Sequence, residues 1–422
     1  MALAAWAFYD WANSAIPTLI TTFVFAAYFT QAVAADPIAG TAAWGTAASL
    51  AALAVALVSP IVGAIADNTG RRKPWLGVAT ALAVISTALL WFVRPSPDHA
   101  LLALVLVAAG TFFFELGMVF YNAMLPALVP RAMIGRMSGW AWGFGYAGGL
   151  AALVFALFGF IKTDSPWFGV GTEDAANVRA VAVLAAGWFA AFAVPLFVFT
   201  PDSPAKGPGL VAAARAGLAA LAGTARRIGE HRGLALFLVA MMCVANGLTT
   251  LFAFGGIYAA ATFGLSFEEL LLFGIAMNVT AGLGAAAFGW LDDRLGPKRT
   301  ISIAVVGLLI LGAAILAAES KTAFWAAALP LGLFVGPAQA AGRSFMAHAA
   351  PPEMRAEMFG LYALAGKATN FLGPAVLAAV TAAAQSQRAG MASILVFFIV
   401  GLILLAPVPD PRTSVAPPIG KS

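Results

Sequence analysis

The stretch that decides the fold is GAIADNTGRRK, Gly63–Lys73, which sets one acid, two glycines and three adjacent cations between two long apolar runs. A second copy, GWLDDRLGPKR, occupies Gly289–Arg299. Three positions agree between the copies at a constant offset of 226 residues: Gly63 with Gly289, Asp67 with Asp293, and Gly70 with Gly296. A short charged hairpin that recurs half a chain later predicts a protein built from two related halves.

The composition predicts an integral membrane protein. Hydrophobic residues make up 62% of the 422 residues and charged residues 10%, whereas soluble domains carry about 25% charged residues. Only helices and closed barrels span a membrane, and the apolar runs are too long and too uniform for barrel strands. We therefore expect an all-α fold. The single cysteine, Cys243, excludes an intramolecular disulfide.

Apolar runs and breaks predict twelve membrane spans in two six-helix bundles. The first run lacks a basic leader and a small-residue cleavage site, so we expect a retained span and not a signal peptide. The predicted spans are Leu3–Val33, Ala42–Ala66, Pro74–Val93, Ala100–Val129, Ile134–Ile161, Val178–Phe199, Gly233–Phe263, Leu270–Leu291, Thr300–Ala318, Thr322–Ala341, Glu357–Ala384 and Gly390–Val408. The corresponding domains are a first bundle over 1–200, a cytoplasmic linker with an amphipathic helix over 201–232, a second bundle over 233–410 and a cytoplasmic tail over 411–422.

Charge predicts the orientation. Most of the 23 Lys and Arg residues fall in the connections that are cytoplasmic if both termini lie inside, as the positive-inside rule requires. The net charge of +5 then reflects topology and not a nucleic-acid surface. We expect the linker helix to lie on the inner leaflet; a partner-binding site is the alternative.

A second repeat supports the two halves. Pro130, Met133, Met137, Gly139 and Gly145 recur 221 residues later as Pro351, Met354, Met358, Gly360 and Gly366. Parallel repeats of this kind place a binding site near the membrane midplane between the halves.

The hairpin resembles the signature loop of the major facilitator superfamily, which joins spans 2 and 3 and recurs between spans 8 and 9. Four further strings resemble the branch of that superfamily named for the autophagy-linked vacuolar amino-acid effluxer of fungi. They are FYDWANSA (Phe8–Ala15), VFYNAMLP (Val119–Pro126), QAAGRSF (Gln339–Phe345) and EMFGLYALAGKATNFLGP (Glu357–Pro374). The resemblance implies efflux of small solutes, with amino acids such as leucine as the named case.

Two ionisable residues lie in the middle of predicted spans, where charged groups cost about 2.5–3.5 kcal/mol each and are functional by default. Glu115 shares a helical face with Asn122, and Lys367 shares one with Asn370. We expect Glu115 and Lys367 to face a central cavity from opposite halves. Glu115 would bind a proton and Lys367 would hold a substrate carboxylate or neutralise Glu115. A static ion pair is the alternative.

Further polar residues are candidates for the substrate and proton pathway. Asp10 and Asn13 form a polar face in the first span, with Ser14 beside them. We expect Asp10 to bind substrate or to pair with Arg136 or Arg343 when an inner gate closes; capping of a helix start is the alternative.

Three other side chains complete this candidate set. Arg343 lies one turn after Gln339 near the inner end of its span, and a simple loop cation is the alternative there. Tyr121 and Tyr146 are candidates for lining the cavity, although interfacial aromatic belts explain most such residues.

The hairpins predict a gating latch. Gly63 and Gly70 permit close helix approach and a tight turn. Asp67 can accept hydrogen bonds from a neighbouring helix start or from Arg71, which would hold the inner face shut until the halves rock. In the alternative the cations only anchor topology. The candidate latch residues besides these are Arg72, Gly289, Asp293, Gly296, Lys298 and Arg299.

The sequence contains no pattern typical of an enzyme or a cofactor site. Its histidines, His99, His231 and His348, are isolated, which argues against a metal centre, and no GxxxxGK[ST] loop indicates direct use of ATP. We therefore interpret the chain as a monomeric secondary transporter in the lipid bilayer, working by alternating access. The predicted function is proton-coupled export of small-molecule substrates such as amino acids. The bacterial inner membrane is the expected location and a vacuolar membrane the other possibility. An importer or drug-type exporter of the same fold, or a non-transporting receptor or scaffold, is the alternative function.

Overall fold

The computed structural model describes residues 1–163, 165–204, 209–227 and 232–412. Within these ranges all regular structure is helical and there is no strand. Twelve helical segments of the described chain are long and apolar enough to cross a membrane, which confirms the predicted number. They are Ala2–Val33, Ala39–Thr69, Lys73–Phe92, Pro97–Leu128, Arg131–Ile161, Glu173–Phe199, Arg232–Phe263, Leu272–Leu295, Pro297–Ala317, Lys321–Ala349, Pro352–Ala384 and Gln387–Leu405.

Fifteen α-helices carry these spans and the linker. Their bounds are α1 Ala2–Asn13, α2 Phe25–Tyr28, α3 Pro37–Thr69, α4 Lys73–Leu89, α5 Ala100–Leu128, α6 Ile134–Ala156, α7 Ala176–Phe199, α8 Leu210–Arg227, α9 Arg232–Phe263, α10 Phe267–Leu295, α11 Pro297–Ala317, α12 Lys321–Ala349, α13 Arg355–Lys367, α14 Leu372–Ala384 and α15 Gln387–Leu405. Short 3₁₀ or π-helical turns extend several of them, among them η1 Ile16–Phe23 and η5 Arg131–Met133.

The first and tenth spans differ from their predicted forms, and so does the eleventh, which is described below. The first span changes at η1 from an α-helix to π-helical turns, because Pro17 lacks the N–H that would bond to Asn13. The tenth span does not end at Ala341 but continues as α12 to Ala349. Its last two turns carry Arg343 and His348, which are both buried. A long polar side chain near the end of an apolar run was thus mistaken for the start of a loop.

Contacts divide the described chain into two compact units that do not follow chain order. Unit 1 comprises Met1–Val58, Gly70–Tyr121 and Phe144–Gly207, and unit 2 comprises Ser59–Thr69, Asn122–Gly143 and Pro208–Ser422. Unit 2 thus combines one end of α3, α5 and α6 with the whole second half of the sequence. The predicted boundaries at 200, 232 and 410 remain predictions about the repeat.

Unit 1 has an aromatic core. The Tyr121 ring stacks on Trp6 at 4.6 Å and on Tyr9 at 4.9 Å between ring centroids. The Trp6 indole N–H donates to the Tyr121 carbonyl oxygen at 3.1 Å, and the Tyr9 and Thr80 hydroxyls are 2.7 Å apart. The polar atoms of the Trp6 and Tyr9 side chains are therefore satisfied inside the core.

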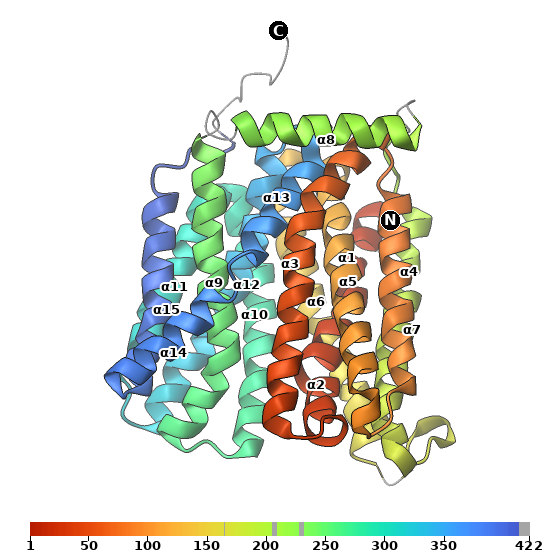
Figure 1. The fold of residues 1–422 in the computed structure, drawn as a ribbon. Helices are drawn as coiled ribbons and strands as arrows, with labels where there is room; N and C mark the ends of the chain where they lie inside the picture. The colour runs from red at the N-terminus through yellow and green to blue at the C-terminus, as the bar shows by residue number, and fades with distance from the viewer. Residues whose placement is uncertain (164, 205–208, 228–231, 413–422) are drawn as a thin grey trace. The chain divides into compact units, whose positions relative to one another are not determined.

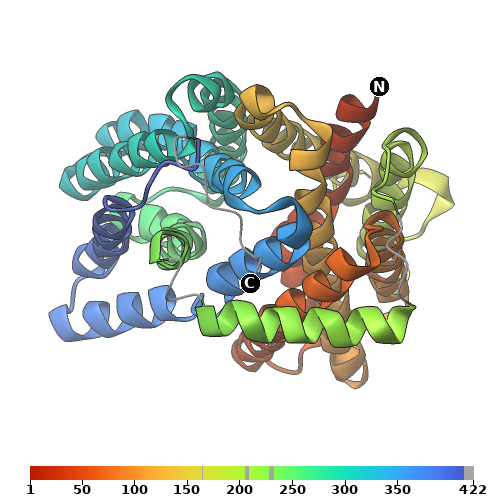
Figure 2. The ribbon, with the colours of Figure 1, turned by 90° about the horizontal axis from the view of Figure 1, so that it is seen from above.

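Unit 2 contains two helices, α8 and α14, whose directions differ from those of α9 and α15. In Figure 1, α8 runs across the direction of α9, as expected for a linker helix on a surface. In Figure 2, α15 is seen nearly end-on whereas α14 lies across the view. The predicted linker residue Lys206, His231 and the tail beyond Arg412 lie outside the described residues.

A capping box starts α10 at the end opposite α8. The Ser266 hydroxyl accepts the Glu269 N–H, and the Glu269 carboxylate accepts the Ser266 N–H at 2.8 Å. That backbone bond, and then the Lys321 ammonium at 2.9 Å, hold the pKa of Glu269 below its ordinary value.

Candidate functional site

The first hairpin caps a helix that comes from the second half of the sequence. The Asp67 carboxylate, 3% exposed, accepts the Glu357 backbone N–H at 2.9 Å. Glu357 is the third residue of α13. N–H groups in a first helical turn lack intrahelical acceptors, and the helix dipole favours an anion there. Asp67 therefore takes one of its two predicted roles, as acceptor for a helix start.

The second hairpin makes the matching contact with a helix from the first half of the sequence. The Asp293 carboxylate accepts the Arg136 backbone N–H at 3.0 Å through one oxygen, and the Arg136 Nε at 3.0 Å through the other. Arg136 is the third residue of α6. The residue numbers of Arg136 and Glu357 differ by 221, the offset of the second sequence repeat. Each hairpin aspartate thus caps the equivalent helix of the other repeat. We call these two contacts the latch.

The two contacts differ in charge. Arg136 adds an ion pair to the Asp293 contact, whereas the residue at the same position in the Asp67 contact is an acid, Glu357. The two contacts of the latch therefore match in their backbone hydrogen bonds and differ in the charge of the capped residue, which sequence symmetry alone did not predict.

Glycines allow the close approach that the latch needs. A Cβ on Gly63 would collide with the Ala356 carbonyl group, and a Cβ on Gly289 would lie 3.0 Å from the Arg136 Cα. Gly70 and Gly296 have φ of 82° and 93°, a region that favours glycine. The predicted roles in helix approach and tight turns match these positions.

The hairpin cations bind to helix ends in addition to any topological role. In unit 1, the Arg72 guanidinium donates to the Ser203 hydroxyl beyond the end of α7 at 3.3 Å, and the Lys73 ammonium donates to the Thr200 carbonyl at 2.7 Å. In unit 2, the Lys298 ammonium donates to the Ala406 carbonyl at 2.8 Å. Arg71 and Arg299 are exposed.

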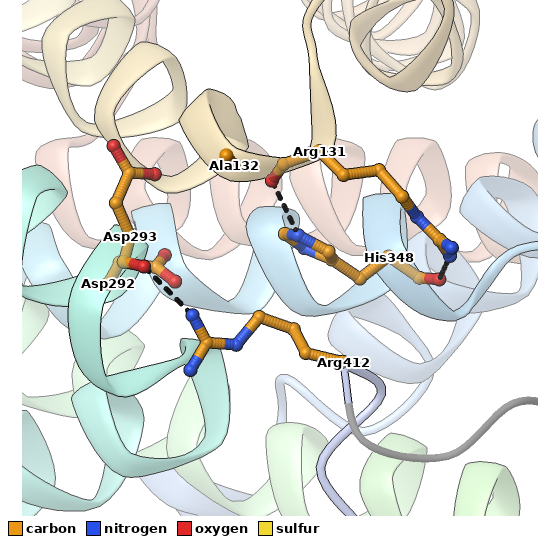
Figure 3. Close-up of a pocket in the computed structure, with 6 residues that line it drawn as sticks. All are labelled: Arg131, Ala132, Asp292, Asp293, His348 and Arg412. Carbon is orange, nitrogen blue, oxygen red and sulfur yellow. Dashed lines mark hydrogen bonds between the residues drawn. The ribbon is translucent and has the colours of Figure 1, made fainter.

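A small cavity lies beside the Asp293 contact (Figure 3). Its volume is about 160 Å³, and it is lined by Arg131, Ala132, Asp292, Asp293, His348 and Arg412. The Arg131 guanidinium donates to the His348 carbonyl at 3.1 Å, and the Arg412 guanidinium donates to the Asp293 carbonyl at 2.8 Å. Sequence reasoning missed Asp292 and treated His348 only as an isolated histidine, since their neighbours are distant in sequence.

Arg343 forms a buried joint between α12 and α6. Its Nε donates to the Ser138 hydroxyl at 2.9 Å, and Nη2 donates to the Ser138 carbonyl at 2.6 Å. Nη1 lies 3.4 Å from the Asn122 side-chain oxygen, and the guanidinium lies over the Trp142 ring at 5.8 Å. Arg343 is 3% exposed and lies inside α12, so the loop-cation alternative is wrong. Gln339 lies one turn before it and is half-buried.

The eleventh span is broken between α13 and α14 at residues 368–371. Pro374 lacks an N–H, and its ring would clash with the Asn370 carbonyl of a continuous helix. Lys367 is therefore the last residue of α13 and Asn370 lies in the turn, so the prediction that they share one continuous helical face is wrong. Such breaks expose backbone groups that bind solutes and ions in transporters.

Asn246 of α9 holds this break in place, a role that no local sequence pattern indicates. Its side-chain NH₂ donates to the Thr369 hydroxyl and to the Met242 carbonyl, each at 2.9 Å. Its side-chain oxygen accepts the Gly373 N–H at 3.1 Å. Asn246 is 2% exposed. It thus bonds a hydroxyl group within the turn and a backbone N–H just after it.

Asn246→Leu should destabilise the protein, because the Gly373 N–H would remain buried without an acceptor at a cost of about 1–3 kcal/mol. The expected result is a lower thermal-unfolding midpoint of the purified protein. Asn278→Leu is the matched control, since Asn278 donates only within α10, to the Gly274 carbonyl at 2.8 Å. Equal midpoints for the two variants would contradict the role of Asn246.

Asp10 and Asn13 lie in unit 1, buried in the last turn of α1. The Asn13 amide donates to the Asp10 carboxylate at 3.2 Å and to the Met118 sulfur at 3.4 Å. Asp10 is at the wrong end of α1 to cap a helix start, so that alternative is wrong. Arg136 pairs with Asp293 at 3.0 Å. The predicted pairing of Asp10 with Arg136 or Arg343 stays a prediction.

The remaining candidates of unit 1 have different surroundings. Glu115 of α5 and Tyr146 of α6 are half-buried. Tyr121 is enclosed by the Trp6 and Tyr9 rings, so in this structure its ring has a packing role. The predicted pairing of Glu115 with Lys367 stays a prediction.

Comparisons with known proteins identify the family. A family model described as "Vacuole effluxer Atg22 like" matches residues 36–416. An uncharacterized MFS-type transporter, YxiO of Bacillus subtilis, is 27% identical over 97% of this chain and 95% of its own length. Autophagy-related protein 22 of Coccidioides immitis is 23% identical over 57% of this chain and 42% of its own length, so the chain matches less than half of that relative.

Solved transporter structures share the fold. The human organic anion transporter MFSD10 (TETRAN) superposes with a TM-score of 0.73, at 16% identity, over 96% of this chain and 98% of its own. These relatives are transporters and not enzymes. The chain is therefore a transporter of the major facilitator superfamily and belongs to its Atg22-like branch.

Proposed function

We propose that the protein exports small amphipathic solutes such as amino acids by alternating access, driven by protons. The observation that carries the proposal is the pair of matched aspartate contacts, Asp67 with α13 and Asp293 with α6. Both join segments from opposite sequence repeats, and both depend on carboxylates that bind helix N-termini. Contacts of this kind are strong enough to hold one conformation and local enough to break together.

In the proposed cycle the latch is closed in one conformation and broken in the other. The Arg343 joint reinforces the closed form, because a forked guanidinium binds both the side chain and the backbone of Ser138. Opening then exchanges these contacts for water at the same end of the helices.

Proton coupling is assigned to Glu115 and solute binding to the broken eleventh span. Glu115 is an acid within a membrane span, and acids in such positions form proton relays in transporters. Lys367 precedes the break that Asn246 holds and Asn370 lies within it, and an ammonium at such a break suits a substrate carboxylate. The family description as effluxers supports export and the named amino-acid class.

We also propose the oligomeric state, the membrane and the orientation of the protein. Two six-helix halves, 1–200 and 233–410, act as a monomer in the bacterial inner membrane with both termini in the cytoplasm. The distribution of Lys and Arg supports this orientation, and the near full-length relative from Bacillus subtilis supports the bacterial membrane.

The test is proton movement in proteoliposomes that contain a pH-sensitive dye, with amino acids, short peptides and amphipathic drugs added in turn. We expect a proton signal with one solute class, and its loss in Glu115→Gln at normal expression. Glu269→Gln is the matched control, because Glu269 lies outside the spans and should keep the signal. Coupled flux that survives Glu115→Gln would reject the proton role of Glu115.

A further inference from the structure

His348 has an arrangement of acceptors that a neutral imidazole cannot satisfy. It is 6% exposed and lies in the last turn of α12. Its Nδ1 lies 2.9 Å from the Ser344 carbonyl oxygen, and its Nε2 lies 3.0 Å from the Arg131 carbonyl oxygen (Figure 3). Carbonyl oxygens only accept hydrogen bonds, and a neutral imidazole has a single N–H. Only the doubly protonated ring can donate to both.

We propose that His348 is a proton-binding site of the latch, occupied when the latch is closed. The charged groups that line its cavity are Arg131, Asp292, Asp293 and Arg412. Arg136, which pairs with Asp293, lies beside this set, so the added proton is held by the two carbonyl acceptors and not by a net negative charge. A neutral ring would instead leave one nitrogen lone pair facing a carbonyl oxygen in a buried place, which is unfavourable.

The two carbonyl acceptors of His348 lie on different elements, and this links proton binding by His348 to closure of the latch. Ser344 belongs to α12, like His348 itself, so that contact persists in any conformation of the helix. Arg131 belongs to η5, between α5 and α6, and its guanidinium donates back to the His348 carbonyl. Opening of the latch separates Arg131 from α12 and removes the acceptor for Nε2.

The closed form therefore binds one more proton than the open form, and a falling pH favours closure. One linked proton changes the closed-to-open ratio by at most about tenfold per pH unit. This inference rests on the proposed latch, but it is independent of Glu115 and of the transported solute.

The test uses the full chain in nanodiscs, labelled with ¹⁵N-histidine. The chain has three histidines, so the signals of His348 are assigned by their loss in His348→Gln, with His99→Gln as the control that retains them. At about pH 7.5 an ordinary imidazole is mostly neutral. We expect the ¹⁵N shifts of His348 to report protons on both nitrogens in the wild type, and an unprotonated nitrogen in Asp67→Asn/Asp293→Asn, whose latch is weakened.

Two results would overturn the proposal. An unprotonated nitrogen on wild-type His348 would exclude the bound proton, and doubly protonated rings in both proteins would exclude the link to closure. The spectra need no substrate, so failure to find a transported solute would count against the proposed function and not against this site.

Discussion

Asparagine in place of Asp293 is expected to shift the latch toward its open form by roughly 30-fold. The substitution keeps an acceptor for the Arg136 N–H but removes the charge that the Arg136 guanidinium pairs with at 3.0 Å. Hydrogen bonds to charged groups contribute about 1.5–3 kcal/mol. We take about 2 kcal/mol, since the Arg136 side chain is 31% exposed and water screens the pair. The measurement is solute turnover against solute binding: turnover should fall and the dissociation constant should change little.

Asp67→Asn is the variant with which Asp293→Asn is compared. Asp67 also caps a helix, and the residue at the position that corresponds to Arg136 is Glu357. Loss of the anion at a helix N-terminus costs about 1 kcal/mol, so Asp67→Asn should shift the latch by at least roughly fivefold. Unchanged turnover in Asp67→Asn would contradict the capping role of Asp67. Lost substrate binding in either variant would argue against a latch altogether.

Arg343→Lys should nearly abolish transport although the charge is retained. The Arg343 guanidinium donates to the hydroxyl and to the carbonyl of Ser138, and a lysine ammonium cannot reproduce this planar fork. Loss of one or two charge-assisted bonds in a buried place costs about 3 kcal/mol, which corresponds to roughly a 100-fold change in the closed-to-open ratio. The measurement is the initial rate of solute flux in proteoliposomes.

Arg215→Lys is the matched control, because Arg215 is exposed on α8 and its substitution should leave flux unchanged. Ser138→Ala tests the same joint from the other side. It removes the hydroxyl but leaves the carbonyl, so its effect should be smaller than that of Arg343→Lys. Wild-type flux in Arg343→Lys would show that the joint has no part in transport.

The sequence predicted the spans and the hairpins because those signals are local. Length and hydropathy define a membrane helix, and the structure places all twelve spans close to their predicted positions. The role of Asp67 as acceptor for a helix start was also predictable, because an acid at a tight turn favours the unpaired N–H groups of a helix N-terminus. Two further local signals are prolines: Pro374 indicates the break after Lys367, and Pro17 indicates the change from an α-helix to π-helical turns within the first span.

The rest depends on contacts between residues far apart in sequence. The partners of Arg343 and His348 lie 205 and 217 positions away. Asn246 meets Gly373 across 127 positions. No periodicity or spacing within one helix specifies which carbonyl a buried side chain will meet, so these residues looked like ordinary polar residues of apolar helices. The repeat identified the two aspartates but not the difference between Arg136 and Glu357.

The most direct test of the account is the distance between spin labels at Ala132 and Arg299, measured in nanodiscs after Cys243→Ala. Both labelled positions are exposed, and they flank the latch on segments from opposite repeats. We predict a short distance for the closed latch and a second, longer distance that becomes dominant in Asp67→Asn/Asp293→Asn. A single short distance, unchanged between the wild type and the double variant, would contradict the claim that this end of the helices opens.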